Sequence, residues 1–242
     1  MVAPAASSPA ASRLAQRLRL LTEEVTVYPV SCERLAAGRS DLEWLRAVLA
    51  GGARIVQLRD KEASSRQLYA KAEAFRRLTS DAGALFIIDD RLDVALAVDA
   101  DGIHLGDQDL PAEAARRLAP ELIIGVSCHS GEDVAAALAQ GASYYNIGPI
   151  FPTATKTGVA RSVGPEAIEA WCRLSPLPFT VMGGIKRDHV PELVRRGARR
   201  LAVVTALTQA PDIEAETRAL VAAIRSALAA RAAGGSSREP EP

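Results

Sequence analysis

The feature that most constrains the fold is an alternation of strand-like and helix-like segments, repeated eight times along the chain. Short β-branched or apolar runs, typical of buried strands, lie at 25–30, 54–58, 85–88, 102–105, 123–126, 143–147, 179–181 and 201–204. Helix-period segments separate them, and side chains that favour helix N-termini predict starts at Asp41, Ser64, Asp133, Asp188 and Asp212. The eight units average about 26 residues each.

Eight successive strand–helix units in one chain favour a (β/α)8 TIM barrel, an α/β fold whose parallel strands are buried by the surrounding helices. The alternative is a doubly wound open sheet. That fold usually carries a glycine-rich fingerprint after its first strand, where this chain has Ser31, Cys32 and Glu33. We therefore predict a single barrel domain over residues 24–233.

The two ends of the chain differ from this central part. Residues 1–23 predict a partly disordered extension that ends in a short helix, because Leu14, Leu18 and Leu21 recur at helical spacing. The arginine-rich, acid-poor leader also matches an organelle transit peptide, and we favour the extension. Residues 234–242 contain no core-forming side chain and predict a disordered tail.

Charge and cysteine content narrow the classes of partner. The chain has 29 Lys and Arg against 29 Asp and Glu, which argues against a nucleic-acid partner but permits a small phosphorylated ligand. No stretch approaches the roughly 20 apolar residues of a membrane helix, so no membrane partner is expected. Three cysteines without a CxxC pair predict a reducing, cytoplasmic location. Homo-oligomerisation stays open.

Polar residues follow the predicted strands rather than precede them, as expected where active sites of this fold lie. After the second strand come Gln57, Arg59 and Lys61, and strand alternation places the first two on one face. Two cations and an amide suit the oxygens of a diphosphate. The alternative is an ordinary solvated loop in which Asp60 neutralises Arg59.

Asp90 and Asp109 follow neighbouring strands, so their carboxylates are expected to converge. Two like charges 4 Å apart repel by about 4 kcal/mol at an effective dielectric constant of about 20, which favours a cation between them. Carboxylates, phosphate oxygens and water together suit Mg²⁺. The alternative is that each aspartate caps the helix that follows, ahead of Leu92 and Pro111.

The segment after the sixth strand supplies Thr153, Thr155 and Lys156 between prolines and a glycine. We predict a loop that closes over charged reactants, with a plain surface turn as the alternative.

Gly184 follows the seventh strand, and Val204 and Thr205 follow the eighth, at the usual phosphate position of this fold. Glycine lets backbone N–H groups approach a phosphate closely. A small phosphorylated ligand is therefore expected at this part of the rim.

The three histidines do not complete a hydrolytic site. His104 is expected inside the barrel as a hydrogen-bonded residue rather than a general base, and His129 is expected to line the site. His189 lies at a helix start and is interpreted as structural. The sequence shows neither a Ser–His–Asp set nor zinc-ligand spacing.

Seven motifs, in this order and spacing, resemble the thiamine-phosphate synthase family over about residues 25–224: QLRDK, IIDDR, DGIHLGDQDLP, GVSCH, GPIFPTATK, MGGI and VVTAL. The resemblance implies a transferase that joins a hydroxymethylpyrimidine diphosphate to a thiazole phosphate, releasing pyrophosphate and forming thiamine monophosphate. It implies that the pyrimidine diphosphate is held by Gln57, Arg59, Lys61, Asp89, Ser127 and Lys156. It implies that the thiazole phosphate is held by Thr153, Thr155, Gly184, Val204 and Thr205. Mg²⁺ would bind Asp90 and Asp109, and the catalytic cations would be Arg59, Lys61 and Lys156.

Two positions depart from the family pattern. Asp89 stands where the family commonly has Asn, which replaces a neutral amide with a carboxylate beside the expected diphosphate. Thr205 stands in place of the usual Ser and keeps a hydroxyl. Two other functions stay open: a related thiazole tautomerase, which needs no diphosphate substrate, and a non-catalytic regulator built on the same barrel.

Overall fold

Eight parallel strands form the centre of the molecule, in the order β1-β8-β7-β6-β5-β4-β3-β2. The computed structural model describes residues 9–153 and 162–235. The strands are β1 (Val27–Pro29), β2 (Ile55–Leu58), β3 (Leu85–Asp89), β4 (Gly102–Leu105), β5 (Ile123–Cys128), β6 (Tyr144–Ile147), β7 (Phe179–Val181) and β8 (Leu201–Val203). A parallel bridge between Val30 and Gln57 joins the two outer strands, β1 and β2. The predicted (β/α)8 barrel is therefore confirmed.

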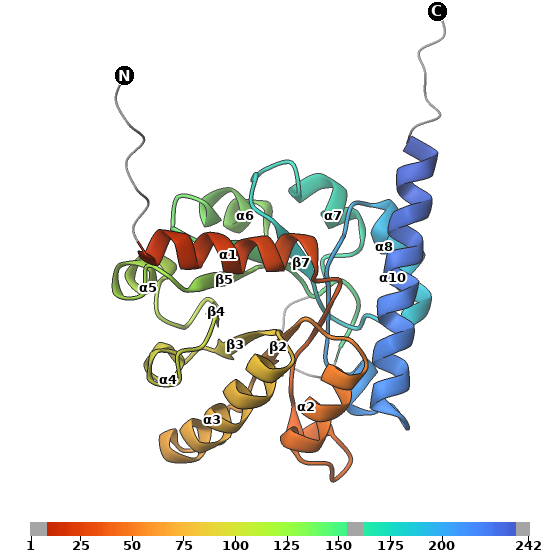
Figure 1. The fold of residues 1–242 in the computed structure, drawn as a ribbon. Coiled ribbons are helices and arrows are strands. Elements are labelled where there is room, and N and C mark those ends of the chain that lie inside the picture. Colours follow the sequence, from red (N-terminus) through yellow and green to blue (C-terminus); the bar gives the residue numbers. More distant parts are fainter. Residues whose placement is uncertain (1–8, 154–161, 236–242) are drawn as a thin grey trace, which may run out of the picture.

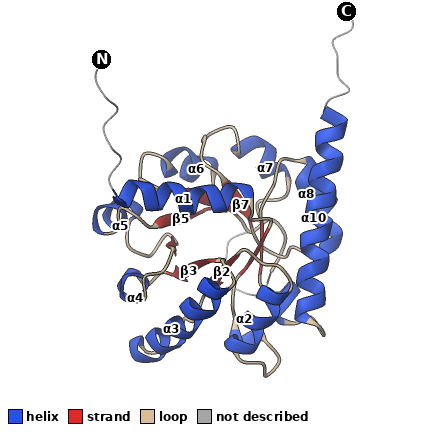
Figure 2. Ribbon diagram, viewed as in Figure 1, coloured by secondary structure: helices blue, strands red, loops and turns tan. Residues whose placement is uncertain are grey.

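Helices surround the strands on the outside (Figures 1 and 2). They are α2 (Asp41–Ala50), α3 (Ser65–Asp81), α4 (Leu92–Ala97), α5 (Ala112–Leu118), α6 (Gly131–Ala137), α7 (Glu166–Trp171), α8 (Val190–Arg195), α9 (Thr205–Thr208) and α10 (Ile213–Gly235). Two short 3-10 helices, η1 (Glu33–Leu35) and η2 (Arg187–His189), lie in the loops, and α1 (Pro9–Glu23) precedes the barrel. The last helix continues two residues beyond the predicted end of the domain at 233.

The start of α3 agrees with the prediction, while those of α2 and α6 do not. Ser64 caps α3 as expected. Ser40, rather than Asp41, caps α2, and Ser130, rather than Asp133, caps α6. Serine hydroxyls and aspartate carboxylates cap equally well, so composition alone does not choose between neighbouring candidates.

Of the last two predicted helix starts, one agrees with the structure and one does not. Asp212 accepts a hydrogen bond from the Ala215 amide at 2.9 Å at the start of α10, as predicted. Asp188 lies within η2, and the residue before α8 is His189, which makes no capping bond through its side chain. The chain thus enters α8 through a 3-10 turn rather than through a side-chain cap.

Side chains alternate between two apolar layers, as the two-residue period of a strand requires. One layer lies between strands and helices. The other fills the barrel and consists of Leu21, Val25, Tyr28, Val30, Ile55, Leu85, Ile87, Ile123, Tyr144 and Ala202. Four of these ten residues, Ile55, Leu85, Ile123 and Tyr144, begin their strands, and Leu21 and Val25 precede β1. The apolar filling therefore lies mainly toward the N-terminal end of the barrel, and polar residues occupy the other end.

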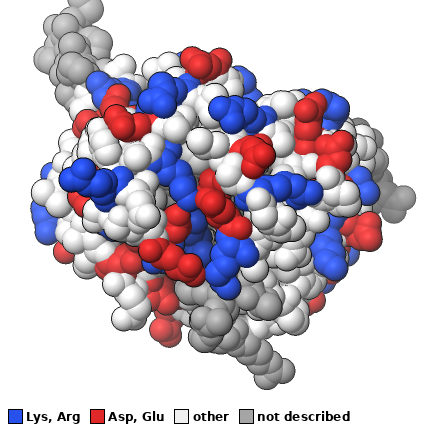
Figure 3. Space-filling view, turned by 90° about the horizontal axis from the view of Figure 1, so that it is seen from below, with Lys and Arg blue, Asp and Glu red and all other residues white. Residues whose placement is uncertain are grey.

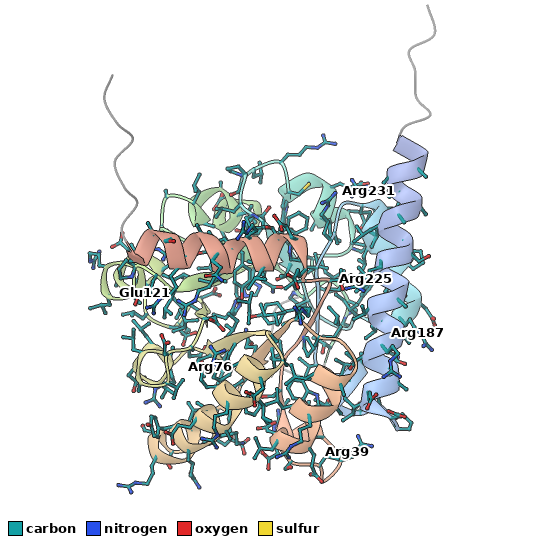
Figure 4. The ribbon with its side chains drawn as sticks, viewed as in Figure 1. Arg39, Arg76, Glu121, Arg187, Arg225 and Arg231 are labelled. Carbon is teal, nitrogen blue, oxygen red and sulfur yellow. The ribbon has the colours of Figure 1, made fainter. Side chains whose placement is uncertain are left out.

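Helix α1 covers that N-terminal end and lies across the strands (Figure 1). Leu21 is fully buried in the inner layer. Arg17 binds Asp101 at 3.1 Å and the Glu121 carbonyl at 2.9 Å; Figure 4 labels Glu121 near the N-terminal half of the helix. Arg200, just before β8, donates to the Leu21 carbonyl at 2.6 Å. The end of the predicted extension is therefore a packed part of the barrel.

Charges are mixed over the face shown in Figure 3, where acidic and basic residues are interspersed and no continuous basic patch is visible. Among the helices of the described ranges, none combines the length and apolar content needed to cross a bilayer. Residues 1–8 of the leader, residues 236–242 of the predicted tail, and Thr155 and Lys156 of the predicted closing loop lie outside the described residues.

Candidate active site

One pocket opens at the C-terminal ends of the strands, opposite α1. It gathers thirteen of the polar and backbone positions that the sequence singles out, and these come from seven of the eight strand ends. They are Gln57, Arg59, Lys61, Asp89, Asp90, His104, Asp109, Ser127, His129, Thr153, Gly184, Val204 and Thr205. The expected convergence on one face is thus observed for the part of the chain that the structure describes. The individual roles of these residues stay predictions.

The two described cations of the pocket bind acids inside it. Arg59 Nε lies 3.4 Å from Asp89 Oδ2, and Lys61 Nζ lies 3.6 Å from the same oxygen. Lys61 also forms a close ion pair with Asp90. The alternative in which Asp60 neutralises Arg59 is therefore wrong, because Arg59 is paired across the strand boundary with β3.

Asp60 has a different partner, Lys71 of α3, at 2.7 Å. The same ammonium binds Asp41 at 2.7 Å and Glu33 at 2.8 Å. Burial raises the pKa of Asp41 to about 6 against the opposing effect of Lys71. Burial would also raise the pKa of Asp60, but the bond to Lys71 lowers it below the ordinary value. Lys71 thus ties the loop that carries Arg59 to two points of the connection between β1 and α2.

Three carboxyl groups meet beside these cations. Burial, followed by the charge of Asp90, raises the pKa of Asp89 to about 7. Burial and a hydrogen bond with Asp90 raise the pKa of Asp109. Burial alone would lower the pKa of Lys61, yet its bond to Asp90 and the nearby charges raise it. Among the described residues, the site therefore holds more negative charge than Arg59 and Lys61 neutralise, which favours an added cation.

Neither Asp90 nor Asp109 caps the helix that follows it. The residues before α4 and α5 are Arg91 and Pro111, and neither helix start has a side-chain capping bond. The capping alternative is therefore wrong. Instead, Asp109 accepts from the Gly106 amide at 2.7 Å, which orients it toward Asp90.

These carboxylates fit the chemistry of Mg²⁺, which prefers oxygen ligands and keeps several from water or substrate. Within residues 9–153 and 162–235, no group of three or more His, Cys, Asp or Glu side chains is arranged to hold a metal alone. Asp90 and Asp109 would thus supply two ligands, and the remaining positions would belong to water and phosphate oxygens.

The opposite side of the pocket is built from backbone. Gly184 has a φ of +61°, and a Cβ there would lie 2.7 Å from the Pro152 carbonyl oxygen, so only glycine fits. Val204 precedes α9 and Thr205 begins it. Backbone amides at such positions are suited to bind phosphate oxygens.

The histidines take the places expected of them. His104 lies in the barrel, hydrogen-bonded to Tyr144 and Ser127. His129 lines the pocket, with Nδ1 2.6 Å from the Gly148 carbonyl. His189 packs on Phe151 with ring centroids 4.0 Å apart.

Sequence reasoning missed three polar residues of the inner face: Tyr28, Tyr144 and Asn146. Tyr28 and Tyr144 share a hydrogen bond of 2.9 Å inside the barrel. Asn146 lines the pocket and accepts from Thr180 at 2.7 Å. Strand parity was the available signal, because Tyr144 and Asn146 alternate with the outward-facing Tyr145.

A (β/α)8 barrel with a charged pocket at the C-terminal ends of its strands defines an enzyme-like class suited to anionic small molecules. A model of the family described as thiamine monophosphate synthase matches residues 27–207, and the chain belongs to that family.

Relatives match over most of their length. The chain is 42% identical over 210 residues to the thiamine-phosphate synthase of Roseiflexus sp. (strain RS-1), covering 86% of this chain and 89% of that protein. It is 41% identical over 202 residues to the one of Pelotomaculum thermopropionicum, covering 83% and 93%. The solved thiamine phosphate pyrophosphorylase of Pyrococcus furiosus superposes with a TM-score of 0.80 at 37% identity, covering 86% and 99%.

Proposed function

We propose that this protein is a thiamine-phosphate synthase. It would condense 4-amino-2-methyl-5-(diphosphooxymethyl)pyrimidine with 4-methyl-5-(2-phosphooxyethyl)thiazole, giving thiamine monophosphate and pyrophosphate. The observation that carries the proposal is the pocket itself, in which cations, paired carboxylates and a glycine-lined backbone wall face one another. Family membership and the similarity to named thiamine-phosphate synthases support it.

The residues suggest a division of the pocket between two substrates. Gln57, Arg59, Lys61, Asp89 and Ser127 line the side proposed for the pyrimidine diphosphate, together with Lys156 of the sixth loop. Thr153, Gly184, Val204 and Thr205 line the side proposed for the thiazole phosphate, together with Thr155. Two anionic groups then approach from opposite walls.

The proposed chemistry is dissociative. The bond between the pyrimidine methylene carbon and the diphosphate oxygen breaks, and the electron pair leaves with the diphosphate. Arg59, Lys61 and Lys156 stabilise the charge that develops there. The aminopyrimidine stabilises the methylene cation, and the thiazole nitrogen then forms the new C–N bond. No general base is needed, so positioning replaces a protein nucleophile.

Asp90 and Asp109 would hold Mg²⁺ in this scheme. The bound ion would supply electrostatic stabilisation to the departing diphosphate. A cytoplasmic location is proposed as well, and it is supported by Cys32, Cys128 and Cys172, which are all free thiols.

The direct test incubates the purified protein with both substrates and Mg²⁺ and measures thiamine monophosphate and pyrophosphate. Equal amounts of both products are expected. Isomerisation of a thiazole without pyrophosphate release would instead identify the tautomerase alternative. Binding of a phosphorylated ligand without either reaction would identify the regulatory alternative.

A further inference from the structure

A chain of hydrogen bonds crosses the barrel beneath the pocket and joins Gln57 on β2 to Ser127 on β5. Gln57 Nε2 donates to the Tyr28 hydroxyl at 3.1 Å, and that hydroxyl lies 2.9 Å from the Tyr144 hydroxyl. The Tyr144 hydroxyl lies 2.9 Å from His104 Nδ1, and His104 Nε2 lies 3.1 Å from Ser127 Oγ. Every link has an ordinary hydrogen-bond length.

The packing inside the barrel leaves space for the residues of this hydrogen-bond chain. A Cβ on Gly125, the β5 residue that pairs in register with His104, would overlap the Tyr144 ring. Tyr28 and Tyr144 are almost fully buried, and burial raises the pKa of each phenol well above its ordinary value. Both hydroxyls therefore keep their protons. Since an unsatisfied buried polar group is costly, each proton needs an acceptor.

These constraints give the chain a direction. Each phenol has one proton, and a neutral imidazole donates from one nitrogen and accepts at the other. Because Gln57 donates to Tyr28, Tyr28 donates to Tyr144, Tyr144 donates to His104 Nδ1, and His104 Nε2–H donates to Ser127. If Tyr144 donated to Tyr28 instead, the Tyr28 proton would have no acceptor among the residues of this hydrogen-bond chain.

We propose that Tyr28, Tyr144 and His104 are positioning residues that set Ser127 as a hydrogen-bond donor and Gln57 as an acceptor toward the bound substrate. Ser127 accepts from His104 and so has its own proton available for an anionic oxygen. Gln57 uses its amide nitrogen in the chain and keeps its carbonyl oxygen for an N–H group. An aminopyrimidine diphosphate offers both partners, so this inference rests on the proposed function.

The first test needs no activity. Nitrogen-15 NMR of the histidine side chains in the unmodified, substrate-free protein, with His104 assigned through its backbone, reports which ring nitrogen carries the proton. The Nε2–H tautomer is expected. The Nδ1–H tautomer would overturn the proposal, and this result stands even if the protein forms no thiamine monophosphate.

The second test is a double-mutant cycle between Tyr144→Phe and Ser127→Ala. Tyr144→Phe should raise the KM for the pyrimidine diphosphate about tenfold, the loss expected for a weakened hydrogen bond to a charged group, and leave the KM for the thiazole phosphate unchanged. In the Ser127→Ala protein, Tyr144→Phe should cause a clearly smaller loss, because only its effect through Tyr28 and Gln57 remains. Equal losses in both backgrounds would show a merely structural role and overturn the proposal.

Tyr145→Phe is the matched control. Tyr145 is the next residue on β6, and its buried hydroxyl has no hydrogen-bond partner among the described residues. This variant also loses a tyrosine hydroxyl, but one that takes no part in the hydrogen-bond chain. Its KM values and its His104 tautomer should therefore equal those of the unmodified protein. If the unmodified protein releases no pyrophosphate, the proposed function fails, and the tautomer measurement still decides the direction of the chain.

Discussion

The charged groups at the two ends of the barrel have opposite surroundings. At the N-terminal end, Arg17 binds Asp101 and backbone carbonyls, and Arg200 donates to carbonyls in the last turn of α1. At the C-terminal end, Asp89 and Asp109 are carboxyl groups whose pKa values are raised by burial and by Asp90 between them.

This difference separates stability from binding. The charged groups at the covered end are bonded within the chain, Arg17 to Asp101 and Arg200 to backbone carbonyls, so changes there should alter the free energy of unfolding more than turnover. The described carboxyl groups at the open end are incompletely neutralised, so changes there should alter turnover while leaving or even raising stability. Four substitutions test this contrast, in decreasing order of expected effect.

Asp109→Asn should reduce the rate of pyrophosphate formation by about 10²- to 10³-fold, because it removes one proposed ligand of Mg²⁺. The free energy of unfolding of the free protein should stay equal or rise, since burial and Asp90 disfavour the Asp109 carboxylate. Asparagine keeps an oxygen to accept from the Gly106 amide. Turnover and urea unfolding measure the two quantities, and a large loss of stability would break the contrast.

Leu21→Ala tests the covered end and should lower the free energy of unfolding by about 2 to 4 kcal/mol, the cost of a cavity at a fully buried leucine. The kcat well below the unfolding transition should stay within about twofold. Leu96→Ala, at a leucine that is 46% exposed on α4, is the control and should change stability by less than about 0.5 kcal/mol. A kcat that falls in parallel with stability would contradict the separation.

Asp89→Asn restores the residue that the family pattern carries. The folded-state pKa of Asp89 is raised from 3.8 to about 7, so ionisation costs the folded protein stability as the pH rises through that interval. In metal-free buffer, the variant should be more stable than the parent by on the order of 1 to 3 kcal/mol above pH 7. This gain should shrink as the pH falls toward 4, and a gain independent of pH would contradict the assignment.

Asp90→Gly tests the backbone of the open end. Asp90 has a φ of +61°, a left-handed conformation that costs a residue with a side chain about 1 kcal/mol relative to glycine. Asp90→Ala removes the same carboxylate and keeps that cost, so the glycine variant should be the more stable of the two by about 1 kcal/mol. Both should lose turnover. Equal stability of the two variants in urea would show that the strain is absent.

Much of the architecture follows from local sequence. Each strand boundary was predicted within two residues, because β-branched runs between helix-period segments admit few other assignments. Helix starts were less predictable where two capping residues lie close together, as Ser40 and Asp41 do. The packing of α1 was also missed: the spacing of Leu14, Leu18 and Leu21 indicates a helix but not the surface that it covers.

The candidate site was predictable where residue type and strand end coincide, as for Arg59, Lys61 and Asp109. The contacts between these residues were not predictable, because each ion pair depends on the distance between neighbouring loops in the folded chain. Arg59 therefore pairs with Asp89 rather than with its sequence neighbour Asp60. The hydrogen-bond chain was not predicted, because tyrosine in a strand usually indicates a packing residue.

The bonds from Arg200 to the carbonyls of Leu21 and Thr22 join positions separated by 179 and 178 residues. Contacts this distant in sequence form late, because the whole intervening chain must first be arranged. During synthesis α1 leaves the ribosome before the strands of the barrel, yet it gains these bonds only after Arg200 has emerged. We therefore expect its docking to be among the last steps of folding, so that nascent chains expose the leucines of α1 to chaperones until the barrel closes.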